Sequence, residues 1–195
     1  MARILLTAFD RYEQWSENSS WLTLVELTSW FELSDNIVTR RYPVNLSEMT
    51  EMLRADLQDG YDAALHIGQA PGASTIKLES TALNLAHDGE SLSSDGPAAF
   101  RSALPLQRWC DELRSAGIPT VVSHHAGTYL CNAALYFSHL FADMYGYSTR
   151  SGFVHLPLSP AQVASRQQRG QEDALASMSV PMMATAIATM VRSIV

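Results

Sequence analysis

The sequence predicts an α/β fold, a three-layer α/β/α sandwich with a central twisted, mainly parallel mixed sheet. Short apolar runs alternate along the chain with segments whose apolar residues recur at helical spacing. The run 63–67 is almost wholly apolar, as expected of a strand covered on both faces. Hydrophobic residues make up 47% of the 195 residues, enough for one full core. We therefore expect a single domain over residues 1–195.

The expected strands are short apolar or β-branched runs that end at turn residues. They cover 3–9, 37–44, 63–67, 76–85, 119–123 and 152–156. Pro43 is expected to stop the second of them, because proline cannot donate a hydrogen bond to the ladder. The polar, glycine-containing stretch 87–97 is expected to be a loop, and Pro157 and Pro160 delimit another.

Helices are expected where apolar residues are spaced for one face and end signals flank them. The stretch 18–20 offers N-cap residues for the first helix, and Asn45 with Glu48 resembles a capping box before the second. Gly60 and Gly117 follow the second and third helices, where glycine commonly ends a helix. The expected helices cover 21–31, 45–60, 105–116, 130–145 and 179–194.

Charge and hydropathy exclude several functions. The formal net charge is −7, and Arg40-Arg41 is an isolated pair, so we expect no nucleic-acid partner. No run of about 18 apolar residues is present, so we expect no membrane span. The start, 1–6, is too short for a signal peptide and is interpreted as strand. Two cysteines do not make a disulfide framework, and a cytoplasmic location is expected.

No cofactor is expected either. The histidines, cysteines and acids lack the spacing of metal ligands, which predicts no metal site. The turn 68–72 has two glycines, but it lacks both a GxGxxG pattern and a phosphate-loop lysine. Its backbone N–H groups are candidates for an oxyanion hole instead.

Cys131 is the most informative residue. It lies where the strand 119–123 turns into the helix 130–145. A thiol at a helix N-terminus has a lowered pKa, because unpaired backbone N–H groups favour the thiolate. Cysteines near apolar helices are also often inert core residues. Cys110 lies in the middle of an expected helix and is interpreted as structural.

His155 and Glu79 are the candidate base and acid. His155 lies at the end of an apolar strand, just before Pro157, where it is either a buried core histidine or a base for Cys131. Glu79 either orients that histidine or pairs with Lys77 at a strand edge. A cysteine, a histidine and an acid on separate strand ends are the parts of a cysteine hydrolase.

Two other histidines are alternatives to His155, and a third has another role. His124 and His125 are rival bases, since they are close to Cys131 in sequence. His66 is interpreted as a supporting or structural residue.

In several segments the chain resembles the pyroglutamyl peptidase I family, cytosolic cysteine omega-peptidases that remove an N-terminal pyroglutamate. The resemblance includes a nucleophile motif at 126–132 and a histidine motif at 152–157. The other similar segments are 5–10, 18–21, 66–70, 79–84, 96–100 and 104–105. The order and spacing of these segments are those of the family over nearly the whole length.

The resemblance implies a catalytic set of Cys131, His155 and Glu79, and a small peptide substrate that carries N-terminal pyroglutamate. It implies acyl transfer to the cysteine, followed by hydrolysis of the thioester. It also implies that substrate is held by four residues, namely Phe9, Tyr12, Gln69 and Tyr129. The alternative interpretation of Phe9 is purely structural, as a core residue at the end of the first strand. The family often forms tetramers, so a homo-oligomer is expected.

Three departures from the family pattern lie near the expected substrate pocket. Tyr12-Glu13-Gln14 stands where the family has Phe-Gly-Gly, and Ala73 stands where arginine is common. The stretch 87–91 is short and lacks an Arg-Ile-Pro-Asp-Asn-type motif. Two alternatives therefore stay open. One is a cysteine amidohydrolase of the same fold with another amide substrate, and the other is a catalytically weak protein that binds pyroglutamyl peptides.

Overall fold

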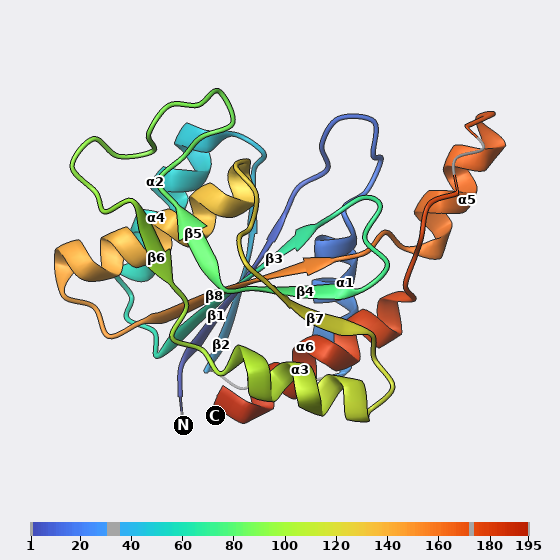
Figure 1. Ribbon diagram of the computed structural model, residues 1–195. Helices are drawn as coiled ribbons and strands as arrows, with labels where there is room; N and C mark the ends of the chain where they lie inside the picture. The colour runs from blue at the N-terminus through green and yellow to red at the C-terminus, as the bar shows by residue number, and fades with distance from the viewer. Residues whose placement is uncertain (1, 31–35, 172–173, 195) are drawn as a thin grey trace.

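The central sheet has six strands in the order β2-β1-β3-β8-β4-β7 within residues 2–30, 36–171 and 174–194, which the computed structural model describes (Figure 1). Neighbouring strands are parallel except for β4 and β8, which run antiparallel. The strands are β1 Ile4–Phe9, β2 Ile37–Tyr42, β3 Ala63–Gln69, β4 Ile76–Glu79, β7 Thr120–Ser123 and β8 Arg150–Leu156. The predicted mainly parallel, mixed sheet is confirmed.

Helices cover both faces of this sheet, because alternate residues of its buried strands point to opposite sides. Ile4 and Leu6 belong to one apolar cluster, and Leu5 between them belongs to the other. The first cluster lies under α1 Ser19–Trp30, α3 Leu106–Ser115 and α6 Val180–Ile194. The second lies under α2 Leu46–Leu57 and α4 Leu130–Tyr145.

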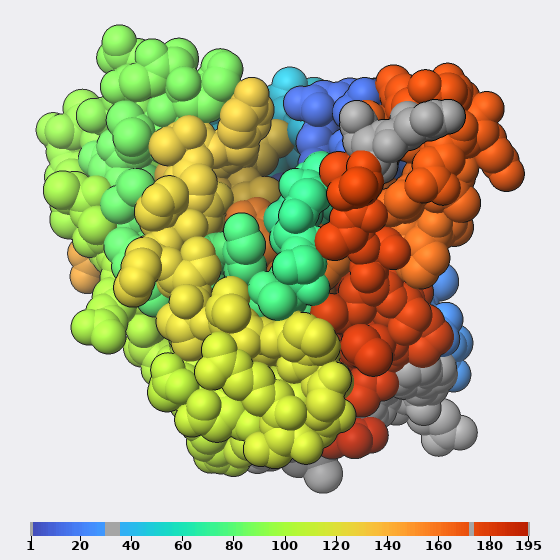
Figure 2. Space-filling view, turned by 45° about the vertical axis from the view of Figure 1, so that its right-hand side comes forward, coloured from blue at the N-terminus to red at the C-terminus, as the bar shows by residue number. Residues whose placement is uncertain are grey.

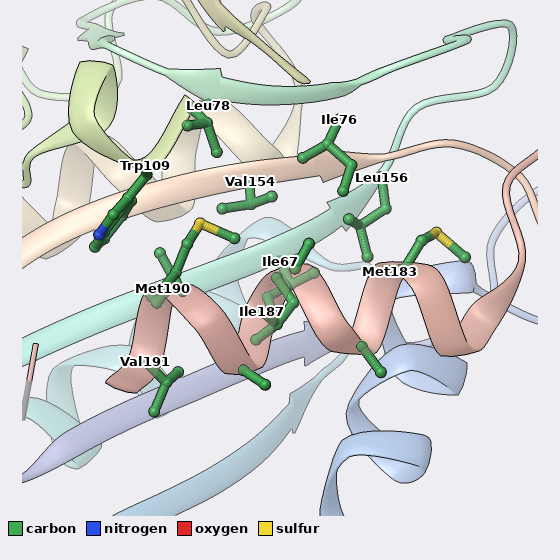
Figure 3. Packing of buried hydrophobic residues seen from close by; sticks show 14 of the residues in the cluster. Ile67, Ile76, Leu78, Trp109, Val154, Leu156, Met183, Ile187, Met190 and Val191 are labelled. Carbon is green, nitrogen blue, oxygen red and sulfur yellow. The ribbon is translucent and has the colours of Figure 1, made fainter. Parts of the chain in front are cut away.

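The packing of α6 shows how the helices of the first apolar cluster are attached to the sheet. Met183, Ile187 and Met190 project from one side of the helix toward Ile67, Val154 and Leu156 on the sheet (Figure 3). All six side chains are fully buried. Burying each of them stabilises the fold by about 1.5–3 kcal/mol before entropy is counted, so this apolar layer is a main source of the stability that holds α6 on the sheet.

One predicted element was wrong, and one helix was not predicted. The run 76–85 is not one strand, because it breaks at Ser80 and continues as β5 Thr81–Leu83, which pairs with β6 Ala99–Arg101 in a separate two-stranded sheet. The loop predicted between Pro157 and Pro160 is present, but the helix that follows it, α5 Pro160–Gln168, was not predicted; it extends from the side of the sandwich (Figure 1).

The other predicted elements are present with small shifts of their ends. The Asn45 side chain accepts a hydrogen bond from the Glu48 backbone N–H at 3.1 Å, as the sequence spacing predicts. Phe31, the expected end of the first helix, lies outside the described residues. No helix in the described part of the chain is long and apolar enough to cross a membrane.

Candidate active site

Strand pairing brings Glu79 and His155 together. Glu79 is the last residue of β4, and His155 is the last but one of β8. In the antiparallel register Glu79 lies opposite Phe153, and His155 lies opposite Lys77. Residues two apart on a strand share a face, so Glu79 and His155 are diagonal neighbours on one side of the sheet.

The two side chains make a close, buried contact. His155 Nδ1 and Glu79 Oε1 are 2.7 Å apart, and only 12% of the His155 side chain and 2% of the Glu79 side chain are exposed. Glu79 therefore does not make a strand-edge pair with Lys77. A carboxylate at Nδ1 selects the tautomer of the ring and leaves Nε2 free for another partner.

That partner is Cys131, the second residue of α4. Burial lowers the pKa of His155, but the negative charge of Cys131, a hydrogen bond to its sulfur, and Glu79 outweigh burial and raise that pKa to about 9. The imidazole is therefore held in its protonated form at neutral pH, between the sulfur of Cys131 and the carboxyl group of Glu79. A cysteine sulfur paired with an imidazole that an acid orients is the arrangement of an activated nucleophile.

Gly68 provides the space in which these groups meet. It lies beside His155 in the β3–β8 register. A Cβ at this position would lie 2.6 Å from Phe153 Cζ and 3.0 Å from Cys131 Sγ. Phe153 is completely buried, so its ring cannot move aside cheaply.

We expect Gly68→Ala to lower kcat/KM by about 10²-fold, because the added methyl group displaces Phe153 and the sulfur from their positions. Overpacking should also lower the free energy of unfolding by about 1–3 kcal/mol. Steady-state kinetics and urea unfolding measure both effects. Adding Phe153→Leu to this variant makes room for the methyl group and should recover part of each. An unchanged kcat/KM in Gly68→Ala would contradict this role for Gly68.

The start of α4 places backbone donors beside the sulfur. Tyr129 is the N-cap and is extended, with φ −87° and ψ −167°, and its side chain caps nothing. The first intrahelical bond runs from Ala133 N–H to Tyr129 O at 3.1 Å, so the N–H of Cys131 has no partner within the helix. Helix N-termini with free N–H groups stabilise negative charge. In the 68–72 turn the Ala70 N–H is already bonded to Leu156 O, so it is not available for the same task.

A pocket of about 390 Å³ opens next to Cys131 and His155, a volume suited to a small ligand. The surface is hollowed between the segment that precedes α4 and the turn that follows β3 (Figure 2). All four residues expected to bind substrate line this pocket: Phe9, Tyr12, Gln69 and Tyr129. The structure thus brings together all seven residues that the sequence singled out for catalysis and binding.

The four lining residues differ in how firmly they are held. Phe9 is 4% exposed and packs edge-on against Tyr42, so it is a core residue as well as a wall of the pocket. Tyr129 is 63% exposed, with its ring 4.9 Å from that of His87. Burial raises the pKa of Tyr12 to about 12, although the nearby Gln69 amide acts in the opposite direction. Tyr12 therefore keeps its proton at neutral pH.

The altered turn at 12–14 carries local backbone strain. Trp15 N–H closes the turn on Tyr12 O at 3.1 Å, and Glu13 adopts φ 51° at the first central position. It is the only residue other than glycine with positive φ in the described part of the chain. Glycine adopts this conformation without a steric penalty, whereas a side chain costs about 1–3 kcal/mol there.

We expect Glu13→Gly to raise the free energy of unfolding by about 0.5–1 kcal/mol, since relief of strain exceeds the added entropy of the unfolded chain. Gln14→Gly is the matched control, because Gln14 has no positive φ to relieve and should lose about 0.5–1 kcal/mol. Thermal or urea unfolding measures both. Equal destabilisation by the two substitutions would show that the turn is unstrained.

The remaining histidines and the second cysteine lie elsewhere. His124 and His125 are exposed outside the pocket, and His125 Nδ1 accepts a hydrogen bond from Gly127 N–H at 3.1 Å. His66 is fully buried against Thr7, and burial lowers its pKa to about 3. Cys110 is buried, and its thiol donates to Thr120 O at 3.4 Å.

A polar residue that contacts the site through Gln69 was missed. Gln162, on α5, is 5% exposed and donates a hydrogen bond from Nε2 to Gln69 Oε1 at 2.7 Å. The segment Ser159-Pro160-Ala161-Gln162 holds the signal that could have found it. Serine at the N-cap, proline at the first helical position and glutamine at N3 are typical of a helix start.

Among the described residues, no group of three or more histidines, cysteines or acids is arranged to hold a metal ion.

A thiol at a helix start, an imidazole and a buried carboxylate beside one pocket are the parts of a cysteine peptidase or related amidase. A family model described as pyroglutamyl peptidase matches residues 2–195. The chain belongs to this family of cysteine omega-peptidases, and the predicted family and enzyme class are confirmed.

Individual relatives agree with this assignment. The pyrrolidone-carboxylate peptidase of Clavibacter michiganensis is 34% identical over 172 residues, which cover 82% of this chain and 80% of that protein. Pyrrolidone-carboxylate peptidase 1 of Ralstonia nicotianae is 34% identical over 178 residues, 84% of this chain and 82% of that protein.

Solved structures of pyrrolidone carboxyl peptidases share the fold. A variant of the Pyrococcus furiosus protein has a TM-score of 0.87 at 28% identity, over 97% of this chain and 96% of that chain. The Thermococcus litoralis protein has a TM-score of 0.84 at 28% identity, over 98% and 92% of the two chains.

Proposed function

We propose that Cys131, His155 and Glu79 are the catalytic residues with which this family member releases N-terminal pyroglutamate from small peptides. The observation that carries the proposal is the Glu79–His155 contact at 2.7 Å beside the sulfur of Cys131, at the edge of a pocket that fits a five-membered lactam. Cys131 is the nucleophile, His155 moves the proton, and Glu79 positions the imidazole.

The first half of the reaction forms a thioester. The sulfur of Cys131 attacks the carbonyl carbon that joins pyroglutamate to the next residue, and a C–S bond forms as the carbonyl oxygen takes the negative charge. The N–H of Cys131 at the start of α4 is the proposed donor to that oxygen. His155 then gives its proton to the departing amine as the C–N bond breaks.

The second half of the reaction reverses these roles. Water attacks the thioester while His155 takes its proton, and the C–S bond breaks to release pyroglutamate. The sulfur leaves as an anion beside the newly protonated imidazole. Because the raised pKa of His155 keeps the ring protonated at neutral pH, the thiolate–imidazolium pair is restored without an external acid.

Substrate recognition is proposed to use the pocket lining. The lactam ring is flat and neutral, so it suits an aromatic wall with few hydrogen bonds. Phe9 and Tyr12 are the proposed wall, Tyr129 lies at the exposed rim, and the Gln69 amide is the proposed donor to the lactam carbonyl.

We also propose that the chain forms a single domain, assembles as a homo-oligomer and is located in the cytoplasm, with no nucleic-acid or membrane partner.

Hydrolysis of a pyroglutamyl-coumarin amide tests the proposal. We expect turnover that is abolished by iodoacetamide. If Cys131 is alkylated rapidly but only a different amide is hydrolysed, the chain is an amidohydrolase of other specificity. If pyroglutamyl peptides bind and no amide is hydrolysed, the chain is a binding protein. Either of the last two results would overturn the proposed substrate or the proposed activity.

A further inference from the structure

The start of α5 determines how the Gln162 amide is oriented. Ser159 N–H donates to Gln162 Oε1 at 2.8 Å, and Gln162 N–H donates back to Ser159 Oγ at 3.3 Å. A backbone N–H can only donate, so the Gln162 atom that faces it must be the oxygen. The capping box therefore directs Gln162 Nε2 away from α5.

Gln162 Nε2 in turn constrains Gln69. It donates to Glu17 O at 2.9 Å and to Gln69 Oε1 at 2.7 Å. Gln69 Oε1 also accepts from the backbone N–H of Ser19 at 2.7 Å. Turning the Gln69 amide over would place its own N–H groups against two donors, so this orientation is the only one that satisfies both contacts.

The group left over is Gln69 Nε2. It is buried, and it makes no hydrogen bond of normal geometry within the described residues. Gln69 lines the pocket beside Cys131, and its amide lies close enough to the Tyr12 hydroxyl to act on the pKa of that group. A buried donor without a satisfied partner is costly in a folded protein, so a ligand carbonyl that accepts from it gains correspondingly.

We propose that Gln162 is a positioning residue for the peptidase reaction, because it holds the Gln69 amide with its N–H groups directed to the lactam carbonyl of the substrate. The inference rests on the proposed function, in which Gln69 binds the pyroglutamyl ring. Gln162 lies outside the pocket lining and acts only through Gln69.

A second contact ties α5 to the same part of the pocket. The guanidinium carbon of Arg166, one turn after Gln162, lies 5.2 Å from the centroid of the buried Trp15 ring. Together with the bond from Gln162 to Glu17 O, this holds α5 against the segment that carries Tyr12. The start of α5 is thus linked by contacts to the parts of the chain that carry Gln69 and Tyr12.

Gln162→Glu is the sharpest test. Glutamate keeps an oxygen for the Ser159 N–H and is favoured at this position of a capping box, so α5 should form normally. Its second oxygen faces Gln69 Oε1 and Glu17 O, which are both acceptors, so the Gln69 amide loses its fixed orientation. Gln167→Glu is the matched control, with the same change at an exposed position of the same helix. Gln162→Met removes the donor without adding a charge.

Two measurements are made on each variant. The first is the concentration of 2-pyrrolidone that halves the rate of Cys131 alkylation by iodoacetamide, which reports lactam binding without turnover. The second is kcat and KM for the pyroglutamyl-coumarin amide. For Gln162→Glu and Gln162→Met we expect the protection constant and KM to rise by about tenfold or more, as loss of one buried hydrogen bond predicts. The alkylation rate without lactam and kcat should stay within about twofold, because Cys131 and His155 are not displaced.

A double-mutant cycle that combines Gln162→Glu with Gln69→Ala distinguishes a positioning role of Gln162 from a general effect on the structure. If Gln162 acts through Gln69, adding Gln162→Glu to Gln69→Ala has no further effect on either constant. Additive effects, or protection of Gln162→Glu equal to that of Gln167→Glu, would overturn the inference alone. Wild-type protein that 2-pyrrolidone does not protect would overturn both the inference and the proposed function.

Discussion

Replacing Cys131 by alanine is expected to reduce kcat/KM for pyroglutamyl-coumarin amide by at least about 10⁴-fold, because no other group near His155 can form the acyl intermediate. Cys110→Ala is the matched control. Its thiol is buried beside Thr120 O and does not line the pocket, so this variant should lose at most about 1–2 kcal/mol of stability and keep nearly all activity. Equal kinetics for the two variants would show that Cys131 is not the nucleophile.

Replacing His155 by alanine is expected to lower kcat about as much as loss of Cys131, since residues of one catalytic unit are not additive. Without the imidazole, nothing deprotonates the thiol or protonates the leaving amine. Glu79→Gln should cost less, because an amide oxygen can still accept from Nδ1 although its charge is lost. Single-turnover kinetics with each variant measures the acylation step directly. Retention of more than about a tenth of the activity in His155→Ala would contradict its role.

The same histidine predicts the alkaline side of the pH profile. In the folded protein its pKa is raised from 6.5 to about 9, so activity that needs the imidazolium should fall as pH rises through about 9. The stability of the folded protein should depend on pH in the same direction. The pair contributes stability that is complete below pH 6.5 and is lost as pH rises through about 9. In Cys131→Ala the negative charge is gone, so the His155 pKa measured by NMR should fall.

Fold class was predictable because local patterns and burial agree in this chain. The apolar run 63–67 forms the first five residues of β3, which is buried throughout, and the strand–turn–helix pattern around Cys131 places the thiol at the start of α4. Parallel strands direct their carboxyl ends to one edge of the sheet, so residues that follow them in sequence converge. The resemblance to the family supplied what spacing could not, namely the choice of His155 over His124 and His125.

Other features depend on contacts that sequence patterns do not show. The break at Ser80 occurs where the chain leaves the main sheet and β5 pairs with β6, about 20 residues further along, which no local period reveals. No helix was predicted after the loop that Pro157 and Pro160 delimit, although α5 begins there with a full capping box. Gln162 was missed because its importance lies in a hydrogen bond to Gln69, a residue 93 positions away in the sequence.

The most direct test of the account follows alkylation and activity in the same sample. Iodoacetamide is added to the wild-type protein, and peptide mapping measures the modified fraction of Cys131 and of Cys110 while pyroglutamyl-coumarin hydrolysis is assayed. We predict that activity falls in proportion to the modification of Cys131, with Cys110 unmodified at the point of complete loss. Substantial hydrolysis by protein whose Cys131 is fully alkylated would contradict the account.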